Sequence, residues 1–474
     1  MSKLDKTDVQ GLVLRGYNFP YARYLFLQFL DRGDPAKPHQ GQELVRELIP
    51  CITTGEDWGK DREKRPQSTV NIAFTYKGLA KLDLPAATLV SFPVEFIQGM
   101  QARGAILCDQ GTNGPEHWEE MWTKHEVHAL LDVNARSREA LDARCRELEE
   151  KVKESRGAII IDRQDAEAIQ IDGKQTSKEH FGYTDGFGNP DYLHIDRATQ
   201  PGQGKLGKNG NWEPLATGEL LLGYADEAGE LPPAPVPHLL ANNGTFMVYR
   251  KLKQHVGKFR NYLKSEGAKY EGGEEKLAAK IVGRWLDGTP VELSPDKPDP
   301  EIVKNRELNV NFTFGKDLQG TRCPMGAHIR RSNPRDAFGF NGELVNRRRI
   351  TRRGMAYGKY VPWGQPADDN EDRGLIFVAL NSSTYRQFEF IQQQWIEYGN
   401  DAHQGSDKDM ITGNHDDHRS SPSRFFVQGT AEEKNSPFVC ANIPNFVQLK
   451  GGDYFFLPSI TALNMIGTGK VDPR

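Results

Sequence analysis

Two kinds of hydrophobic segment alternate along the chain. Runs rich in β-branched and aromatic residues are typical of strands, and they occur at 11–15, 69–76, 126–133, 158–162, 244–249, 349–353 and 375–380. Segments that gather hydrophobic residues on one face are typical of helices, and they occur at 21–29, 92–102, 138–152, 253–263 and 384–398. The segment 447–457 is predicted to form a hairpin.

Two of the predicted helices have a clear buried face. The helix at 138–152 carries charges on one side and four hydrophobic residues on the other, namely Leu141, Cys145, Leu148 and Val152. The helix at 384–398 is expected to end at Gly399 and to bury Phe388, Ile391, Trp395 and Tyr398.

The order of these elements predicts an α+β protein with two ferredoxin-like domains, each an antiparallel sheet with flanking helices. The length of 474 residues is typical of two or three domains. We expect the boundary within Thr199–Trp212, a segment rich in Gly, Lys and Asn with almost no apolar residues. The N-terminal domain would then span residues 1–212 and the C-terminal domain residues 213–474.

Composition narrows the classes of function. A net charge of −4 and a pI near 6.3 provide no general basic surface for nucleic acid. No apolar run approaches the length of a membrane span, and the N-terminus lacks the apolar core of a secretory signal. The five cysteines are scattered and never form a Cys-x-x-Cys pair, a pattern that fits a reducing compartment. The sequence therefore predicts a soluble, cytoplasmic protein without membrane or nucleic-acid partners.

The run Cys323–Arg335 places one histidine, His328, among small and apolar residues and follows it with arginines at 330, 331 and 335. A neutral imidazole is a common axial ligand of haem iron. Guanidinium groups beside it are suited to the two propionates of a haem. The alternative is a buried histidine next to a basic turn.

The run Phe181–Pro190 places Asp185 between glycines, with aromatic residues on either side. An aspartate in such a turn can simply accept hydrogen bonds from its own backbone. The functional alternative is a carboxylate in a tight pocket, where the glycines allow another group to approach closely.

The run Arg347–Gly358 holds five arginines within seven residues. A patch that binds RNA or another anion is one interpretation, but the aromatic residues of a stacking platform are missing. Because side chains alternate along a strand, either Arg352 or Arg353 would point inward. A buried guanidinium requires an anionic partner.

These three runs together resemble the dye-decolorizing peroxidases, a family of haem peroxidases. The G-x-x-D-G motif of the family is matched by Gly182–Gly186, its proximal-histidine segment by Gly326–Arg335 and its distal-arginine segment by Arg349–Gly358. Further similarity at Gly16–Leu25 and Gly451–Pro458 extends the resemblance over almost the whole chain. The long insertions suggest the larger bacterial subgroup.

The resemblance implies one haem b per chain, held mainly by the C-terminal domain, with His328 as the iron ligand. Asp185 and Arg352 would be the catalytic pair on the opposite haem face. Asp185 would move a proton between the two oxygens of hydrogen peroxide, and Arg352 would stabilise the negative charge that develops. Because an aspartate has an ordinary pKa of about 3.9, activity is expected at mildly acidic pH.

The resemblance also implies supporting residues. Asp409 is the best match to an acidic residue that holds the ligand imidazole, and Asp407 is the alternative. Arg330, and more weakly Arg335, would bind the propionates. Two residues match positions that line the distal pocket, Leu375 and Phe377.

One position departs from the family pattern. Some members carry an asparagine two residues after the distal arginine, where this chain has Gly354. His194 is an alternative polar group for the distal site, unless it is simply a surface residue.

Bulky dyes and phenols would be oxidised at the surface through Tyr or Trp residues, and oxidation of Mn(II) is a further option. A homodimer is expected because the family often forms dimers.

Two other classes of function compete with a peroxidase. A haem-handling protein would use the same ligand, His328, but it would not need Asp185 and Arg352. A zinc hydrolase would use the pairs at 125 and 128 or at 415 and 418, but neither pair has the H-E-x-x-H spacing.

Overall fold

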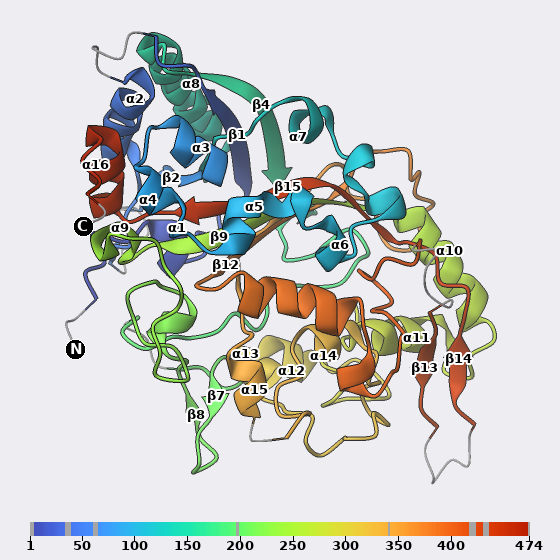
Figure 1. Cartoon of the computed structure of the whole chain (residues 1–474). Coiled ribbons are helices and arrows are strands. Elements are labelled where there is room, and N and C mark those ends of the chain that lie inside the picture. The colour runs from blue at the N-terminus through green and yellow to red at the C-terminus, as the bar shows by residue number, and fades with distance from the viewer. Residues whose placement is uncertain are drawn as a thin grey trace.

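A nine-stranded antiparallel sheet forms the centre of the protein (Figure 1). The computed structural model describes residues 4–33, 39–59, 65–195, 199–339, 342–416, 423–429 and 436–472. The strands follow the order β10-β12-β9-β15-β2-β3-β1-β4, and β11 pairs with β12. Their bounds are β1 Tyr21–Phe29, β2 Ser68–Phe74, β3 Ala129–Ala135, β4 Ala158–Glu167, β9 Thr245–Gln254, β10 Thr351–Arg352, β11 Met355–Tyr357, β12 Gly374–Asn381 and β15 Val447–Leu457.

The predicted α+β class with antiparallel sheets and flanking helices is confirmed, and the structure adds that the strands of both halves share one sheet. They meet where Phe456 of β15 pairs with Phe74 of β2. Strand β11 lies against β4, so the two ends of the sheet approach each other as in a barrel. The division of the chain into domains at residue 212 stays a prediction.

Helices cover the sheet on more than one side. Helices α2 (Gln40–Leu48), α8 (Arg138–Ser155) and α16 (Ile460–Thr468) pack together beside the N-terminal strands, and α5 (Val94–Ala102) packs against β15 (Figure 1). The other α-helices are α1 Gly11–Leu14, α3 Tyr76–Lys81, α4 Ala86–Leu89, α6 Gly104–Leu107, α7 Glu120–Lys124, α9 His238–Ala241, α10 Val256–Gly267, α11 Gly273–Val282, α12 Pro300–Lys304, α13 Arg306–Val310, α14 His328–Ser332 and α15 Glu343–Asn346. Among the described residues, no helix combines the length and the apolar character needed to span a bilayer.

The remaining elements are short. In the described part of the chain, three two-stranded sheets are formed by β5 Gln170–Ile171 with β6 Lys174–Gln175, by β7 Lys205–Leu206 with β8 Trp212–Glu213, and by β13 Phe425–Val427 with β14 Phe438–Cys440. The predicted helix at 384–398 is present with π-type hydrogen bonding, as η6 (Tyr385–Glu389) and η7 (Ile391–Ile396). It ends before Gly399, and Tyr398 is 46% exposed rather than buried.

Three segments differ from the prediction because long-range packing outweighs local pattern. The segment 21–29 is strand β1 between β3 and β4, and its Tyr24 and Phe26 pack edge-on against Tyr249 of β9. The segment 11–15 is the short helix α1. Residues 447–457 form one continuous strand, in which a bulge between Leu449 and Gly451 stands where a turn was predicted. A Cβ atom at residue 451 would lie 2.0 Å from the indole of Trp122, so only glycine allows this close approach.

Candidate active site

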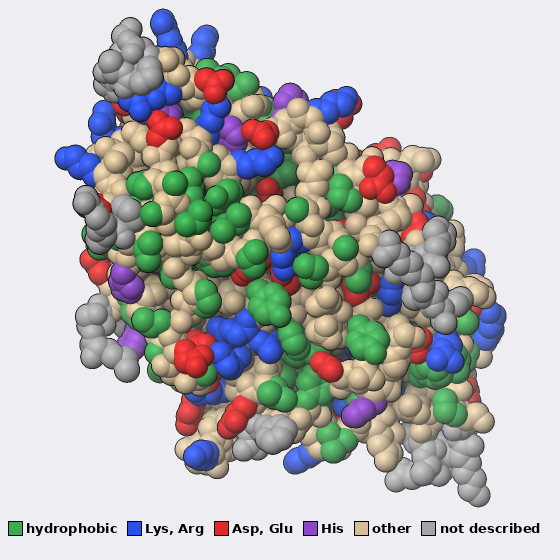
Figure 2. All heavy atoms as spheres, in the orientation of Figure 1, with side chains coloured by type: hydrophobic (Ala, Val, Ile, Leu, Met, Phe, Trp, Pro, Cys, Tyr) green, Lys and Arg blue, Asp and Glu red, His purple; other side chains and the backbone are tan. Residues whose placement is uncertain are grey.

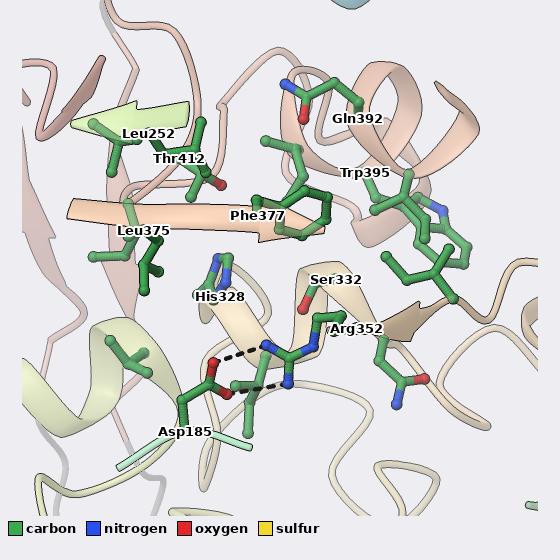
Figure 3. Close-up of a pocket in the computed structure, with 18 of the residues that line it drawn as sticks. Asp185, Leu252, His328, Ser332, Arg352, Leu375, Phe377, Gln392, Trp395 and Thr412 are labelled. Atoms are coloured by element: carbon green, nitrogen blue, oxygen red, sulfur yellow. Dashed lines mark hydrogen bonds and ion pairs between the residues drawn. The ribbon is translucent and has the colours of Figure 1, made fainter. Parts of the chain in front are cut away.

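A cavity of about 320 Å³ lies beside strands β9 and β12, and it is lined by residues from segments far apart in the sequence. Cavities of this size are typical of small-molecule and cofactor sites. Asp185, His328 and Arg352 all line it (Figure 3). The structure thus brings together residues from all three runs singled out in the sequence.

His328 begins the short helix α14, and its imidazole is held from behind by Asp409. Nδ1 of His328 lies 3.1 Å from each carboxylate oxygen of Asp409. The Asp409 carboxylate is fully buried and also accepts hydrogen bonds from the backbone N–H groups of Ile411 and Thr412. Burial by itself would raise the pKa of Asp409, but His328, Arg331 and the backbone N–H of Thr412 together hold that pKa below its ordinary value. Because Nδ1 is engaged, Nε2 is the imidazole nitrogen available to a ligand in the cavity.

The structure separates the two aspartates that the sequence left as alternatives. The Asp407 carboxylate accepts a hydrogen bond from the backbone N–H of Arg424. Asp409, not Asp407, is therefore the carboxylate on the His328 imidazole.

Asp185 and Arg352 form a bidentate ion pair in the cavity. Nη1 and Nη2 of Arg352 lie 2.9 Å and 3.1 Å from the two carboxylate oxygens. The side chains of Asp185 and Arg352 are 46% and 36% exposed, so both are accessible to a small molecule in the cavity. Burial would raise the pKa of Asp185, but Arg352, with smaller effects of the Gly186 backbone and His328, leaves that pKa below its ordinary value. Asp185 is therefore an ionised carboxylate at neutral pH, ready to accept a proton.

The loop that presents Asp185 depends on glycines and on Glu179. Gly182 and Gly186 have φ values of 105° and 90°, a region that L side chains rarely adopt. The buried Glu179 carboxylate accepts the backbone N–H groups of Phe181 and Tyr183, both at 2.9 Å. Nε2 of Gln254 on β9 donates to the same carboxylate at 2.6 Å. Glu179 was not identified from the sequence, where it is only one carboxylate before a glycine-containing turn.

Three buried arginines line the cavity without a carboxylate partner among the described residues: Arg284, Arg335 and Arg349. They donate to main-chain carbonyls and, in one case, to an asparagine side chain. Burial, with a further effect of Arg349 and Arg284, lowers the pKa of Arg335 well below its ordinary value. Such an excess of buried positive charge suits an anionic ligand in the cavity.

Arg330 lies outside this cavity, in contrast to its predicted role. Its guanidinium is fully buried and donates to the Asp317 carboxylate at 3.2 Å and to the Cys323 carbonyl at 2.7 Å. It also stacks over the ring of Phe314. The reason is the geometry of α14, which turns residue 330 away from the cavity that His328 faces. Arg284, Arg335 and Arg349 line the cavity, whereas Arg330 does not.

Strand β12 supplies the apolar wall of the cavity. Leu375 and Phe377 lie on the same face of β12, as their spacing predicts, and both line the cavity.

Residue 354 has no room for a side chain, since a Cβ atom there would lie 2.2 Å from the carbonyl oxygen of Ile376. An asparagine cannot occupy that position without a backbone shift. His194 is exposed and does not line the cavity.

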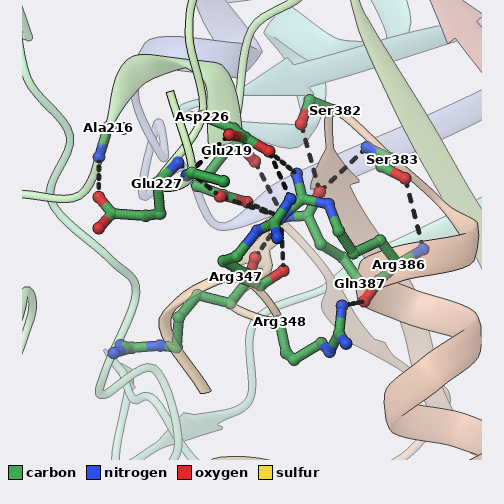
Figure 4. A network of polar contacts seen from close by, with 12 residues as sticks. Ala216, Glu219, Asp226, Glu227, Arg347, Arg348, Ser382, Ser383, Arg386 and Gln387 are labelled. Carbon is green, nitrogen blue, oxygen red and sulfur yellow. Dashed lines mark hydrogen bonds and ion pairs between the residues drawn. The ribbon is translucent and has the colours of Figure 1, made fainter. Parts of the chain in front are cut away.

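A buried polar network anchors the segment that carries Arg352 to helix η6 (Figure 4). Arg386 donates to the Glu219 carboxylate at 2.7 Å and to the carbonyl of Arg347 at 2.9 Å. Gln387, which is fully buried, donates to the carbonyl of Arg349 at 2.6 Å. The backbone between residues 347 and 349 is therefore fixed from outside the cavity.

Two of the histidines considered for zinc, His128 and His415, have other partners. Nδ1 of the buried His128 accepts a hydrogen bond from the backbone N–H of Phe29. His415 contacts main-chain carbonyls, and His418 lies outside the described residues. In the part of the chain that the structure describes, no three His, Cys, Asp or Glu side chains are grouped to hold a metal ion.

Comparison with known proteins gives consistent matches. The family model "DyP dimeric alpha+beta barrel domain" matches residues 8–163. Dye-decolorizing peroxidase msp1 of Mycetinis scorodonius is 29% identical over 478 residues, covering 98% of this chain and 88% of the relative. A solved ancestral D-type dye decolorizing peroxidase has a TM-score of 0.82 at 30% identity, covering 98% of this chain and 99% of that chain. A dye-decolorizing peroxidase in complex with 2,6-dimethoxyphenol has a TM-score of 0.81 at 26% identity, covering 98% and 100%.

The origin of the relatives does not support the predicted bacterial subgroup. Matches over nearly the whole chain include fungal proteins from Mycetinis scorodonius and Auricularia auricula-judae. The multifunctional dye peroxidase DyP2 of Amycolatopsis is 32% identical, but the match covers only 61% of each chain.

Proposed function

The chain belongs to the dye-decolorizing peroxidase family, and we propose that it is a haem peroxidase that uses Asp185 and Arg352 to reduce hydrogen peroxide. Dyes, phenols and similar one-electron donors are its reducing substrates, and a relative solved with 2,6-dimethoxyphenol supports the phenols. One observation carries the proposal. The Asp185–Arg352 pair and the imidazole held by Asp409 line the same cavity.

The residues around the cavity fit a haem. Nε2 of His328 is the available iron ligand, and Leu375 and Phe377 supply apolar contact. Arg335 and Arg349 carry buried positive charge that two propionates would compensate. Bound haem supplies an iron centre that takes two oxidising equivalents from peroxide and passes them on one at a time.

The side chains of Asp185 and Arg352 transfer the proton and stabilise the developing charge. The ionised Asp185 carboxylate accepts a proton from peroxide and returns it to the departing oxygen, which leaves as water. The Arg352 guanidinium stabilises the negative charge that develops as the O–O bond breaks. The ion pair holds both groups in position before peroxide enters, so little reorganisation is needed.

We further propose one haem b per chain, held mainly by residues 213–474, while residues 1–212 supply the Asp185 loop. A homodimer is supported by the description of the matching family model as dimeric. A cytoplasmic location is supported by the pattern of the five cysteines, which are scattered and form no Cys-x-x-Cys pair, as is typical of a reducing compartment.

Absorption spectra test the proposal. Wild-type protein loaded with haem should show a Soret band, and His328→Ala should lose or shift it. His194→Ala, a change at an exposed histidine outside the cavity, should leave the spectrum unchanged. An unchanged spectrum in His328→Ala would remove the proposed ligand. A normal spectrum without turnover of peroxide and 2,6-dimethoxyphenol would favour a haem-handling protein.

A further inference from the structure

The imidazole of His180 is buried at the tip of the loop that presents Asp185. Several histidines reach the surface on the face shown in Figure 2, whereas His180 has no exposed area. The backbone N–H of Asp185 donates to the carbonyl of Ser177 at 2.7 Å and closes the base of this loop. The backbone N–H of Glu179 donates to the carbonyl of Tyr183 at 3.0 Å and closes its tip. A contact made by His180 therefore acts on the backbone that carries Asp185.

His180 joins this loop to the strand that follows Arg352. Nε2 of His180 lies 2.8 Å from the carbonyl oxygen of Tyr357, the last residue of β11. Because a carbonyl only accepts, Nε2 carries the hydrogen and Nδ1 of the neutral ring carries a lone pair. Nδ1 is buried and has no hydrogen-bond partner among the described residues. The ring thus holds the Asp185 loop to β11 through its Nε2–H group.

Residues 358–368 cover the same loop from outside, and we call them the cover segment. A Cβ atom at Gly182 would lie 3.2 Å from the indole of Trp363, so this segment rests directly on the loop. Arg260 of α10 donates to the carbonyls of residues 361, 362 and 365. Arg373, just before β12, donates to the carbonyls of residues 359 and 368. Two guanidinium groups therefore fix the cover segment over the loop.

The surroundings of His180 disfavour a positive charge on its ring. Burial, with the charges of Arg373 and Arg260, lowers the pKa of His180 to about 4, although the carbonyl that accepts its N–H acts in the opposite direction. The phenol of Tyr360 faces the ring, with the two centroids 6.2 Å apart. The Glu179 carboxylate of the same loop instead accepts backbone N–H groups. The imidazole is therefore neutral at neutral pH, and a proton on Nδ1 would be buried without a partner.

We propose that His180 is a positioning residue for Asp185, and that its neutral imidazole holds the loop against β11. The proposal rests on the peroxidase function stated above, in which Asp185 accepts a proton from peroxide. Because that transfer requires hydrogen-bond reach, a small displacement of the loop slows it. The unfolded chain takes up the imidazole proton near pH 6.5 and the folded chain only near 4, so acidification between these values favours release of the loop.

Two substitutions separate the hydrogen bond from the titration. His180→Gln places an amide NH₂ near the position of Nε2 and cannot take up a proton. It should keep the peroxide rate within about threefold of the wild type at neutral pH. Its acid limit should move to lower pH, because Asp185, whose pKa lies below its ordinary value, then sets that limit. His180→Leu has no donor and should react roughly tenfold more slowly. Stopped-flow kinetics of the haem-loaded proteins across the acidic range measures these effects.

His128→Gln is the matched control. His128 is also buried with a lowered pKa, but it accepts the backbone N–H of Phe29 and does not line the cavity. Its replacement should leave both the rate and the acid limit unchanged. A shift of the acid limit in His128→Gln as large as that in His180→Gln would overturn the proposal, because any buried histidine would then suffice.

Hydrogen exchange of the haem-loaded proteins gives a readout that does not depend on turnover. The backbone N–H groups of residues 177–185 should exchange roughly fivefold faster in His180→Leu than in the wild type, and at the wild-type rate in His180→Gln. Wild-type exchange and rate in His180→Leu, or an unchanged acid limit in His180→Gln, would overturn the proposal. If His180→Leu does not fold, His180→Asn, whose amide lies near the position of Nδ1, replaces it with the same expected result. Faster exchange in a protein whose wild type never turns over peroxide would reject the activity and leave the hold on the loop standing.

Discussion

The guanidinium of Arg352 and the carboxylate of Asp185 meet at 2.9 Å and 3.1 Å although 167 positions separate them in the sequence. Arg352 is fixed by the short strand β10, and Asp185 by a loop that Glu179 organises. Neither side chain alone is an unusual feature of a protein. Their meeting in a cavity turns a surface-type ion pair into a group that can move a proton and stabilise charge.

Replacement of the arginine should change the pH dependence of the reaction with peroxide. In the wild type, Arg352 holds the pKa of Asp185 below its ordinary value, so the rate should persist into acidic solution. In Arg352→Leu, burial remains while the cation is gone, so the pKa rises and the acid limb moves to higher pH. The maximum rate should also fall by roughly 10²–10³. Stopped-flow kinetics of the haem-loaded protein measures both effects.

Arg353→Leu is the matched control for that experiment, because Arg353 points away and donates to the carbonyls of Leu12 and Val13. It should keep the acid limb of the wild type. An acid limb at the same pH in Arg352→Leu would show that a group other than Asp185 accepts the proton.

Removal of the charge behind the ligand should alter the electronic properties of bound haem. Asp409→Asn replaces the carboxylate 3.1 Å from Nδ1 of His328 with a neutral amide. Because a carboxylate there makes the imidazole more electron-donating, the iron(III)/iron(II) reduction potential should become more positive. Spectroelectrochemistry measures the change. Asp407→Asn should leave the potential near its wild-type value, and equal shifts in both variants would contradict the assignment.

Loss of the Glu179 carboxylate should impair the Asp185 loop without removing haem. In Glu179→Gln, one oxygen becomes an amide NH₂ that cannot accept the N–H of Phe181 or Tyr183. The unfolding free energy should fall by about 1–3 kcal/mol, and the rate with peroxide should fall roughly tenfold because Asp185 is misplaced. Gln254→Leu removes the other partner, and a double-mutant cycle should show coupling between the two. If the two substitutions had additive effects on the unfolding free energy, Glu179 and Gln254 would not act together in holding the loop.

The arginines near the cavity should differ in what they support. Arg349→Leu should weaken haem binding, since it removes buried positive charge that lines the cavity. Arg330→Leu should instead lower the unfolding free energy by about 3–5 kcal/mol, because it leaves the buried Asp317 carboxylate unpaired. Urea unfolding and haem titration of both variants separate the effects. Weakened haem binding with normal stability in Arg330→Leu would restore its predicted role.

The sequence allowed the three motif residues to be predicted because each lies in a short run with its own unusual composition. It favoured Asp409 through the family resemblance but left Asp407 as an alternative, since the choice depends on which carboxylate faces His328 after folding. Arg330 was assigned by its nearness to His328 in sequence, but the short helix α14 turns it away. Glu179 and Arg284 act through contacts with distant segments, and nothing in their local sequence marks them.

The same limit applies to secondary structure. Helix α8 was predictable because its buried face repeats along one segment. Strand β1 was not, because Tyr24 and Phe26 are as hydrophobic in a helix as in a strand. Only their packing against Tyr249 of β9 selects the extended form.

Strand β15 lies between β9 and β2, yet it follows every other strand of this sheet in the sequence. During synthesis on the ribosome, the strands on either side must therefore wait for residues 447–457 before the sheet can close. Asp409 also emerges long after Asp185, and both belong to the same site. Contacts between such distant segments form slowly. Cofactor capture is consequently a step that follows translation of nearly all the residues described here, not one that can guide the early folding of the nascent chain.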